Sequence, residues 1–530
     1  MSFVSLNFFV FFALSLVIYY LLYKLCPKWQ WVSLLVASYV FYMWSSPMLV
    51  FFLLSSTFTT WIFPLLIERT VEKNGMFIKK LNDGISPEQK KNIQLKSEMQ
   101  KKCLLALCLI CNLGILILLK YYDIITDTLG LFGIHLSVVN HIVVPLGISF
   151  YTFQSIGYCI DVYRGIAKAE HNFLRYALYV SFFPQISQWP IGRYTDMAPS
   201  LYAPRKFCYN SFVLGLERML LGFFKKIVVA DNIGIFVNQI YDTPSTYSGL
   251  TLLFATICYG IQLYADFSGY MDITLGVSRC FGITLAENFD TPYFSKSISE
   301  FWRRWHISLS SWFRDYLYYP ILRSKLVISI GKTLSHKGYK KCSKSITTSI
   351  GLLITWLFIG LWHGSTLNYI FYGLYHGFFI IIDASFSSVY QNLKNKLGIK
   401  QKSHAWQLFQ MFRTFFIVCI GYILFRSDNL STASIVFNRI ITNISFKNLS
   451  AEITSELFTK SYWSLIAVSI SILYIIELIE RKMTFAECIT KLSLPTRWII
   501  LYSLILFILF VSLFTDITTA GSGNFLYFNF

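Results

Sequence analysis

Long apolar segments recur along the whole chain, and charged residues gather between them. About 20 apolar residues in a helix cross a hydrocarbon core of about 30 Å. By this rule the pattern predicts membrane-spanning helices at 6–23, 31–46, 48–67, 103–120, 249–265, 346–362, 366–383, 408–425, 462–478 and 498–514. The sequence therefore predicts an all-α polytopic membrane protein.

Two further apolar segments are interrupted. Residues 142–163 contain Pro145 near their start, and residues 173–192 contain Pro184 and Pro190. Broken helices at membrane depth are tolerated where they are buried in protein or line a cavity. The middle of the chain is therefore expected to surround a polar interior.

Composition and charge agree with this pattern. Hydrophobic residues make up 55% of the 530 residues and charged residues only 14%, which is more apolar surface than a soluble core can bury. The net charge of +19 would suggest nucleic acid in a soluble protein. Here the basic residues gather in two polar loops, 68–102 and 321–346, so no nucleic-acid partner is predicted.

The two basic loops also predict an orientation. The positive-inside rule places both in the cytoplasm, and the three spans before the first loop then place the N-terminus outside. The span that follows the second loop ends at His363, which should lie in the outer half of the membrane. Topogenic charge explains the basic residues, with contact to anionic lipid headgroups or an acidic partner as the alternative.

The eleven cysteines predict no disulfide framework and no metal site. Most of them lie inside apolar segments. Cys108 and Cys111 have zinc-like spacing, but no second ligand pair is near them, and they suit small apolar positions of a helix.

Ionisable residues concentrate between 263 and 320. Asp266 lies in LYADFSGYMDITLG, and Arg304 and His306 lie in SEFWRRWHISLSSWFRDYLYYP. Ionisable groups at membrane depth are costly unless paired, so they mark candidate functional positions. An amphipathic helix at the membrane interface would also explain the Arg and Trp residues of this segment, but it explains His306 less well.

A histidine can take a proton from a hydroxyl, which makes an alcohol attack a thioester. His306 and His363 are the candidates for this chemistry, because the sequence contains neither a GxSxG nor an HExxH motif. A lone membrane histidine is more often structural than catalytic. His376, in the span after His363, is interpreted as such a packing residue.

Several long segments resemble the membrane-bound O-acyltransferase family, in its alginate O-acetyltransferase-like branch. They are QLYADFSGYMDITLG, ENFDTPYFSKSISEFWRRWHISLSSWFRDYLYYP, LWHGSTLNYIFYGLYHG and the terminal FLYFNF. The resemblance implies a ring of tilted and broken transmembrane helices around a central tunnel, which joins a cytoplasmic donor side to an outer acceptor side. It implies a catalytic core in 142–390, N-terminal spans in 1–120 and C-terminal spans in 405–530, all within one polytopic domain.

The resemblance also implies the reaction. His363 of the WHG motif would be the catalytic residue and general base, and His306 its partner, orienting the donor or stabilising the oxyanion. Asn368 and Tyr316 are weaker candidate hydrogen-bond donors, and Arg304 and Asp266 are possible supporting residues.

The implied donor is a cytoplasmic acyl thioester, either acyl-CoA or an acyl carrier protein, with no bound cofactor. Its acyl group, most simply acetyl, would go to hydroxyls of an extracytoplasmic polysaccharide, either directly or through an acetyl-receiving partner protein. The implied location is the plasma (inner) membrane of a bacterium.

Three alternatives remain. Within the family, the chain could transfer D-alanine to teichoic acid. Outside it, a membrane transporter would also use broken helices and buried charges, although its usual repeated halves are not found. A structural scaffold would leave both histidines unused. The chain departs from the family pattern at Leu367 and Tyr372, where Trp is frequent, and at Leu322 and Arg323, where a Gly-Gly turn is frequent.

Overall fold

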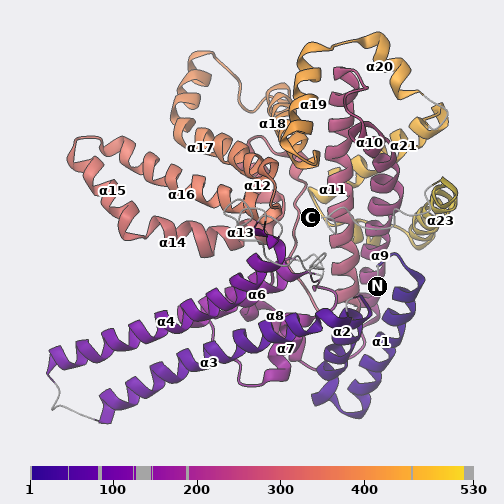
Figure 1. Ribbon diagram of the computed structural model, residues 1–530. Helices are drawn as coiled ribbons and strands as arrows, with labels where there is room; N and C mark the ends of the chain where they lie inside the picture. The colour runs from indigo at the N-terminus through magenta and orange to yellow at the C-terminus, as the bar shows by residue number, and fades with distance from the viewer. Residues whose placement is uncertain are drawn as a thin grey trace. The chain divides into compact units, whose positions relative to one another are not determined.

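A computed structural model describes residues 3–45, 47–80, 86–122, 125–126, 145, 147–186, 190–454 and 458–518. In these residues all regular structure is helical (Figure 1). Nine of the described helices are long and apolar enough to cross a membrane. The prediction of an all-α polytopic membrane protein is confirmed, whereas the ring and the tunnel stay predictions. The terminal FLYFNF segment lies outside the described residues.

The chain divides into two compact units. The first comprises Met1–Phe212 and Ser278–Ala286, and the second comprises Val213–Val277 and Glu287–Phe530. Both candidate histidines belong to the second unit. The division of one domain at 1–120, 142–390 and 405–530 stays a prediction.

The helices up to residue 202 are α1 (Leu6–Leu25), η1 (Pro27–Trp29), α2 (Gln30–Ser45), η2 (Pro47–Leu49), α3 (Val50–Lys80), α4 (Pro87–Lys120), α6 (Ile148–Tyr163), α7 (Phe173–Ser181) and α8 (Tyr194–Tyr202). Helix α2 has 16 residues and spans about 24 Å, which is short for the predicted crossing at 31–46. Helices α3 and α4 lie side by side as a long hairpin (Figure 1).

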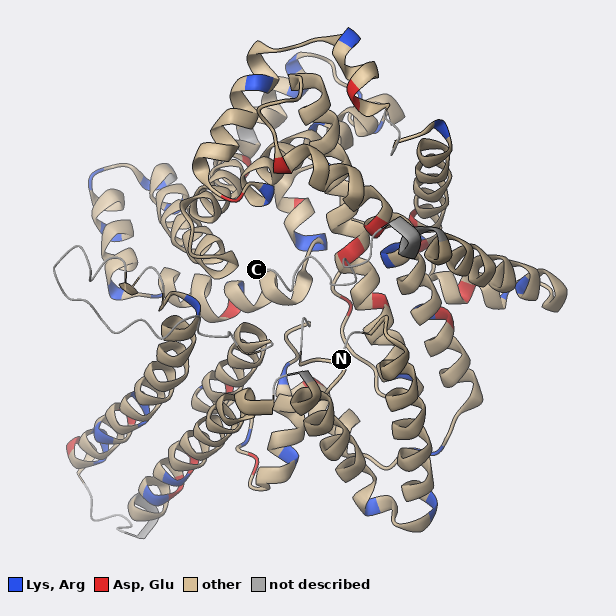
Figure 2. Cartoon of the chain, turned by 45° about the vertical axis from the view of Figure 1, so that its right-hand side comes forward, with Lys and Arg blue, Asp and Glu red and all other residues tan. Residues whose placement is uncertain are grey.

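The predicted loop at 68–102 is wrong for most of its length. Helix α3 continues to Lys80, and α4 begins at Pro87. Ser86 caps α4 in a capping box. Its side chain accepts from the Gln89 N–H (3.2 Å), and the Gln89 side chain accepts from the Ser86 N–H (3.2 Å). Lys, Glu and Gln favour helix, so the two helices continue through these polar residues. The polar residues mark where the hairpin leaves the membrane and not where its helices end. They line its far half (lower left of Figure 2).

The predicted breaks in the middle of the chain are confirmed. Helix α6 begins after Gly147, whose φ of 68° lies in the left-handed region that glycine adopts at no steric cost. Helix α7 ends at Ser181, before Pro184. Proline lacks the N–H that a helix interior needs, and helices commonly end shortly before one.

The remaining helices are α9 (Tyr209–Phe223), the π-helical turn η4 (Phe224–Ala230), α10 (Asp231–Asp242), α11 (Gly249–Cys280), η5 (Pro292–Phe294), α12 (Ile298–Arg304), α13 (Ile307–Phe313), the π-helical turn η6 (Arg314–Tyr318), α14 (Tyr319–Leu322), α15 (Lys325–His336), α16 (Lys340–His363), α17 (Leu367–Lys396), α18 (His404–Arg426), α19 (Leu430–Thr442), α20 (Phe446–Ile453), α21 (Lys460–Glu480), α22 (Phe485–Thr490) and α23 (Leu494–Thr518). The predicted loop at 321–346 is therefore largely helical too.

Helix α11 runs 15 residues beyond the predicted end at 265. Its second half carries buried carboxylates, and each has a lysine partner on the π-helical turn η4. Lys225 Nζ lies 2.9 Å from Asp272, and Lys226 Nζ lies 2.8 Å from Asp266. Buried charges persist when they are paired in this way, which allows a spanning helix to contain such residues.

Candidate active site

His363 is the last residue of α16. Helices α16 and α17 cross closely because small residues meet there: a Cβ on Gly360 would lie 2.5 Å from the Tyr369 carbonyl oxygen, and one on Gly373 would meet the Gly360 backbone. Small residues let membrane helices approach in this way. The crossing fixes the end of α16 and with it the position of His363.

Aromatic rings surround the His363 imidazole, which is 4% exposed. Its centroid lies 4.7 Å from that of Trp362, 5.0 Å from Phe425 and 5.6 Å from Tyr372. The C-terminal end of a helix carries a partial negative charge, which stabilises a cation there.

His306 joins α12 to α13 in a strained conformation. Its φ is 47°, a left-handed value that is uncommon outside glycine, and it is 1% exposed. The surrounding structure has to hold such a residue in place, and residues of this kind cluster at functional sites. The backbone geometry thus marks His306 independently of its chemistry.

Asn288 fixes the orientation of the His306 ring. Its Oδ1 accepts from the Ser308 N–H (3.0 Å) and from the Ser308 hydroxyl (2.9 Å), so both lone pairs are used. Its Nδ2 lies 3.2 Å from His306 Nδ1. Nδ1 also lies 3.3 Å from Oδ1. Because that oxygen already accepts two hydrogen bonds, the arrangement favours donation from the amide to Nδ1, and we assign the proton of the neutral imidazole to Nε2. His306 Nε2 has no hydrogen-bond partner among the described residues, so this N–H can serve a substrate.

Burial keeps this ring neutral, because it lowers the pKa of His306 to about 3. A neutral imidazole with its proton on Nε2 is a hydrogen-bond donor at that atom and not a base. The two histidines are thus suited to different tasks.

Asn288→Asp should make the reaction pH-dependent. A carboxylate at position 288 accepts from Nδ1–H, so the proton of the neutral His306 ring moves from Nε2 to Nδ1. The rate of transfer at pH 8 should then fall roughly tenfold, which is less than the loss expected when the imidazole itself is removed. The carboxylate also raises the pKa of His306. Below that pKa both nitrogens carry protons, so activity should recover as the pH falls. Initial rates in isolated membranes between pH 6 and 8 test this, and a variant profile parallel to the wild-type profile would contradict it.

An ion-paired anchor holds the segment that carries Asn288. The neighbouring Glu287 carboxylate receives two hydrogen bonds from the Arg218 guanidinium, both 2.6 Å long. Arg218 also donates to Asp272 on α11 (2.8 Å). Bidentate arginine–carboxylate pairs fix geometry as well as charge. Helices α9 and α11 thereby set the position from which Asn288 reaches His306.

The structure brings the two predicted histidines together around Trp362. This indole lies 4.7 Å from the His363 ring and 6.1 Å from the His306 ring. The two histidines are 57 residues apart in the sequence, so only the fold can place them at one aromatic cluster. Two imidazoles at one aromatic cluster could supply a base and a hydrogen-bond donor, which are the groups that acyl transfer to a hydroxyl requires.

The supporting candidates have other partners. Asn368 donates to the carbonyls of Leu424 (3.1 Å) and Ser427 (2.7 Å), so it ties α17 to the end of α18. Arg304 pairs with Glu300 (2.9 Å). In these contacts both side chains stabilise the arrangement of the helices.

Tyr316 and Asp266 also contact other side chains. The Tyr316 ring lies 5.3 Å from that of Trp312, and Asp266 pairs with Lys226. Phe267, next to Asp266, packs edge-on against His306 with ring centroids 4.9 Å apart. Helix α11 therefore lines the His306 side of the site through an apolar residue.

Sequence reasoning did not single out Asn288. It lies within the ENFDTPYF segment used for the resemblance, but 18 residues separate it from His306 and no local spacing joins them. His376 is fully buried and packs against Trp302 and Tyr372, with ring centroids 5.0 and 4.7 Å away. No group of three His, Cys, Asp or Glu side chains in the described part of the chain is placed to hold a metal ion.

Comparison with known proteins assigns the chain to a family. The model of the membrane-bound O-acyltransferase family matches residues 167–335. A probable alginate O-acetylase of Pseudomonas syringae is 32% identical over 82% of this chain and 74% of that protein. The peptidoglycan O-acetyltransferase of Helicobacter pylori is 28% identical over 68% and 69%. The teichoic acid D-alanyltransferase of Bacillus subtilis is 30% identical over 53% and 68%.

This chain therefore belongs to the membrane-bound O-acyltransferase family and is a multi-pass membrane O-acyltransferase. The protein is therefore an enzyme, and not the transporter or the scaffold that the sequence left as alternatives.

Proposed function

We propose that this enzyme transfers acetyl groups from an acyl thioester to hydroxyls of an extracytoplasmic polysaccharide, across the inner membrane of a bacterium. The observation that carries the proposal is the pair of buried histidines around Trp362, one suited to act as a base and the other as a hydrogen-bond donor. The names of the relatives from Pseudomonas and Helicobacter support acetyl as the group and a polysaccharide as the acceptor.

His363 acts as the general base in the proposed mechanism. Its imidazole takes the proton of the acceptor hydroxyl while the oxygen attacks the thioester carbonyl. The Nε2–H of His306 donates to the carbonyl oxygen as negative charge develops there. When the tetrahedral intermediate collapses, the carbon–sulfur bond breaks and the imidazolium returns its proton to the leaving thiolate. The products are an ester and a free thiol, so no further reactant is needed.

Direct transfer between two bound substrates needs no acyl-enzyme. The donor would be acyl-CoA or an acyl carrier protein on the cytoplasmic side. The acceptor is the polysaccharide itself or a partner protein that passes the acetyl group on. D-alanyl transfer to teichoic acid is the second candidate, favoured by the 30% identity to the Bacillus enzyme over 53% of this chain.

Mass spectrometry of envelope and secreted glycans, from cells with and without this protein, tests the proposal. Loss of ester-linked acetyl is expected in its absence. Loss of ester-linked D-alanine instead would assign the second candidate, and unchanged glycan esters would overturn both.

The orientation predicts selective labelling of Cys342, which is exposed at the start of α16. Residues 321–346 hold seven Lys or Arg and no acid, so this region should face the cytoplasm. With the other exposed cysteines replaced by serine, an impermeant maleimide should label Cys342 only after the membrane is opened. Labelling in intact cells would exchange the donor and acceptor sides.

A further inference from the structure

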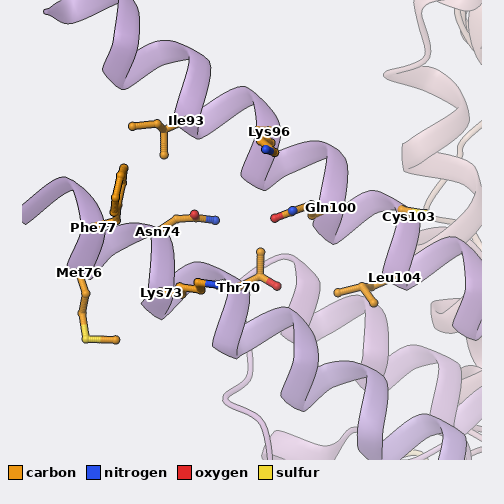
Figure 3. Close-up of a pocket in the computed structure, with 10 residues that line it drawn as sticks. All are labelled: Thr70, Lys73, Asn74, Met76, Phe77, Ile93, Lys96, Gln100, Cys103 and Leu104. Carbon is orange, nitrogen blue, oxygen red and sulfur yellow. The ribbon is translucent and has the colours of Figure 1, made fainter. Parts of the chain in front are cut away.

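A cleft of about 870 Å³ opens between the polar halves of α3 and α4, within the first unit. Figure 3 shows its lining, to which each helix contributes five residues, with Asn74 and Gln100 pointing toward each other across the space. None of these residues belongs to the acyl-transfer site.

The cleft is positively charged and lacks compensating acid. Lys73 and Lys96 line it, and no Asp or Glu does. Neither lysine forms an ion pair with a described residue, whereas Lys101 on the same hairpin pairs with Glu98 (2.5 Å). Two lysines, with amide donors between them, suit a phosphate group.

The positions of Thr70 and Gln100 along the hairpin match the depth of lipid headgroups. Helix α3 carries no charge up to Ile67, and α4 carries none from Cys103 until Lys120, so these levels mark the edge of the hydrocarbon core. Thr70 and Gln100 each lie three residues beyond that edge, or about 4.5 Å along the helix axis. The headgroup layer is about 5–8 Å thick on each side of a bilayer.

The lysines and the apolar lining of the cleft also fit a lipid. Lys73 and Lys96 begin about 9–10.5 Å beyond the edge of the core, and their long side chains can reach back to the level of the phosphates. Cys103 and Leu104 line the end of the cleft nearest the core, where a lipid chain would lie. Charge alone would suit an acidic protein as well, but donors placed at headgroup depth favour a lipid.

We propose that this cleft binds one anionic phospholipid, with its phosphate beside Gln100 and reached by Lys73 and Lys96, its headgroup hydroxyls near Asn74, and an acyl chain along Leu104. Basic pockets between membrane helices are a recurrent solution for binding anionic headgroups.

The test is native mass spectrometry of the purified full chain, titrated with phosphatidylglycerol, phosphatidylcholine or soluble glycerol phosphate. The wild-type protein should retain phosphatidylglycerol in preference to the other two. Each lysine should contribute roughly fivefold to the affinity, so Lys73→Gln with Lys96→Gln should weaken binding roughly 25-fold. Both side chains are exposed, so the variant should fold normally.

The matched control replaces Lys90 and Lys91 by glutamine. They lie on α4, are exposed and do not line the cleft, so the net charge changes equally and phosphatidylglycerol binding should change less than twofold. An equal loss in the control would show that binding reflects overall charge and would overturn the proposal. So would equal affinity for glycerol phosphate, or lysine-dependent binding of an acidic carrier protein without discrimination among lipids.

Discussion

His363→Ala should abolish product ester while the protein still inserts and accumulates normally. Removing a general base typically lowers a rate about 10²- to 10⁴-fold. His363 ends α16 among aromatic rings. The measurement is ester-linked acetyl on the glycan, at matched protein level, in cells whose only copy carries the substitution.

Two further variants make this result specific. His363→Gln should be as inactive as the alanine variant, because an amide cannot accept the hydroxyl proton. His336→Ala, at an exposed position of α15, should leave acylation unchanged. Near-normal acylation by His363→Ala at an equal protein level would rule out the mechanism, whatever the family membership implies.

His306→Ala should lower transfer about 10²- to 10³-fold, the usual effect of losing an oxyanion donor. Detectable product should remain at high donor concentration, because the base at His363 is intact. The wild-type rate should not titrate through His306 between pH 5 and 9, since its pKa lies near 3. A rate series against donor concentration in isolated membranes measures the loss.

His306→Gln separates a hydrogen-bond donor from a base. Glutamine places an amide N–H close to where the imidazole has Nε2, so it should retain clearly more activity than His306→Ala. The same exchange at His363 should rescue nothing. If glutamine and alanine at position 306 are equally inactive, the Nε2–H is not the group that matters and the role drawn from Asn288 is wrong.

The membrane-spanning helices were predictable from the sequence because about 20 apolar residues have one stable arrangement in a bilayer. The ends of the helices were not. Helices α3 and α4 continue through charged residues, and hydropathy reports where a helix leaves lipid and not where its hydrogen bonds stop. The extension of α11 to Cys280 was missed because its charges find partners on η4.

The candidate site was predictable in its residues but not in its arrangement. His306 and His363 could be named because ionisable residues at membrane depth are rare and because their motifs resemble a family. Asn288 could not be named, since an Asn in a polar loop has no local signal. The role proposed for His306 also depends on a tautomer that Ser308 favours through Asn288.

The sequence by itself determined that this protein lies in a membrane and that it is helical, and it named two histidines as the candidates for its chemistry. These features follow from local composition and from residue types. The tertiary structure decided which groups meet: the two histidines at Trp362, Asn288 at the His306 ring, and two uncompensated lysines at one cleft of the first unit. These contacts join residues that are far apart in the sequence, and only helix packing and paired buried charges bring such residues together.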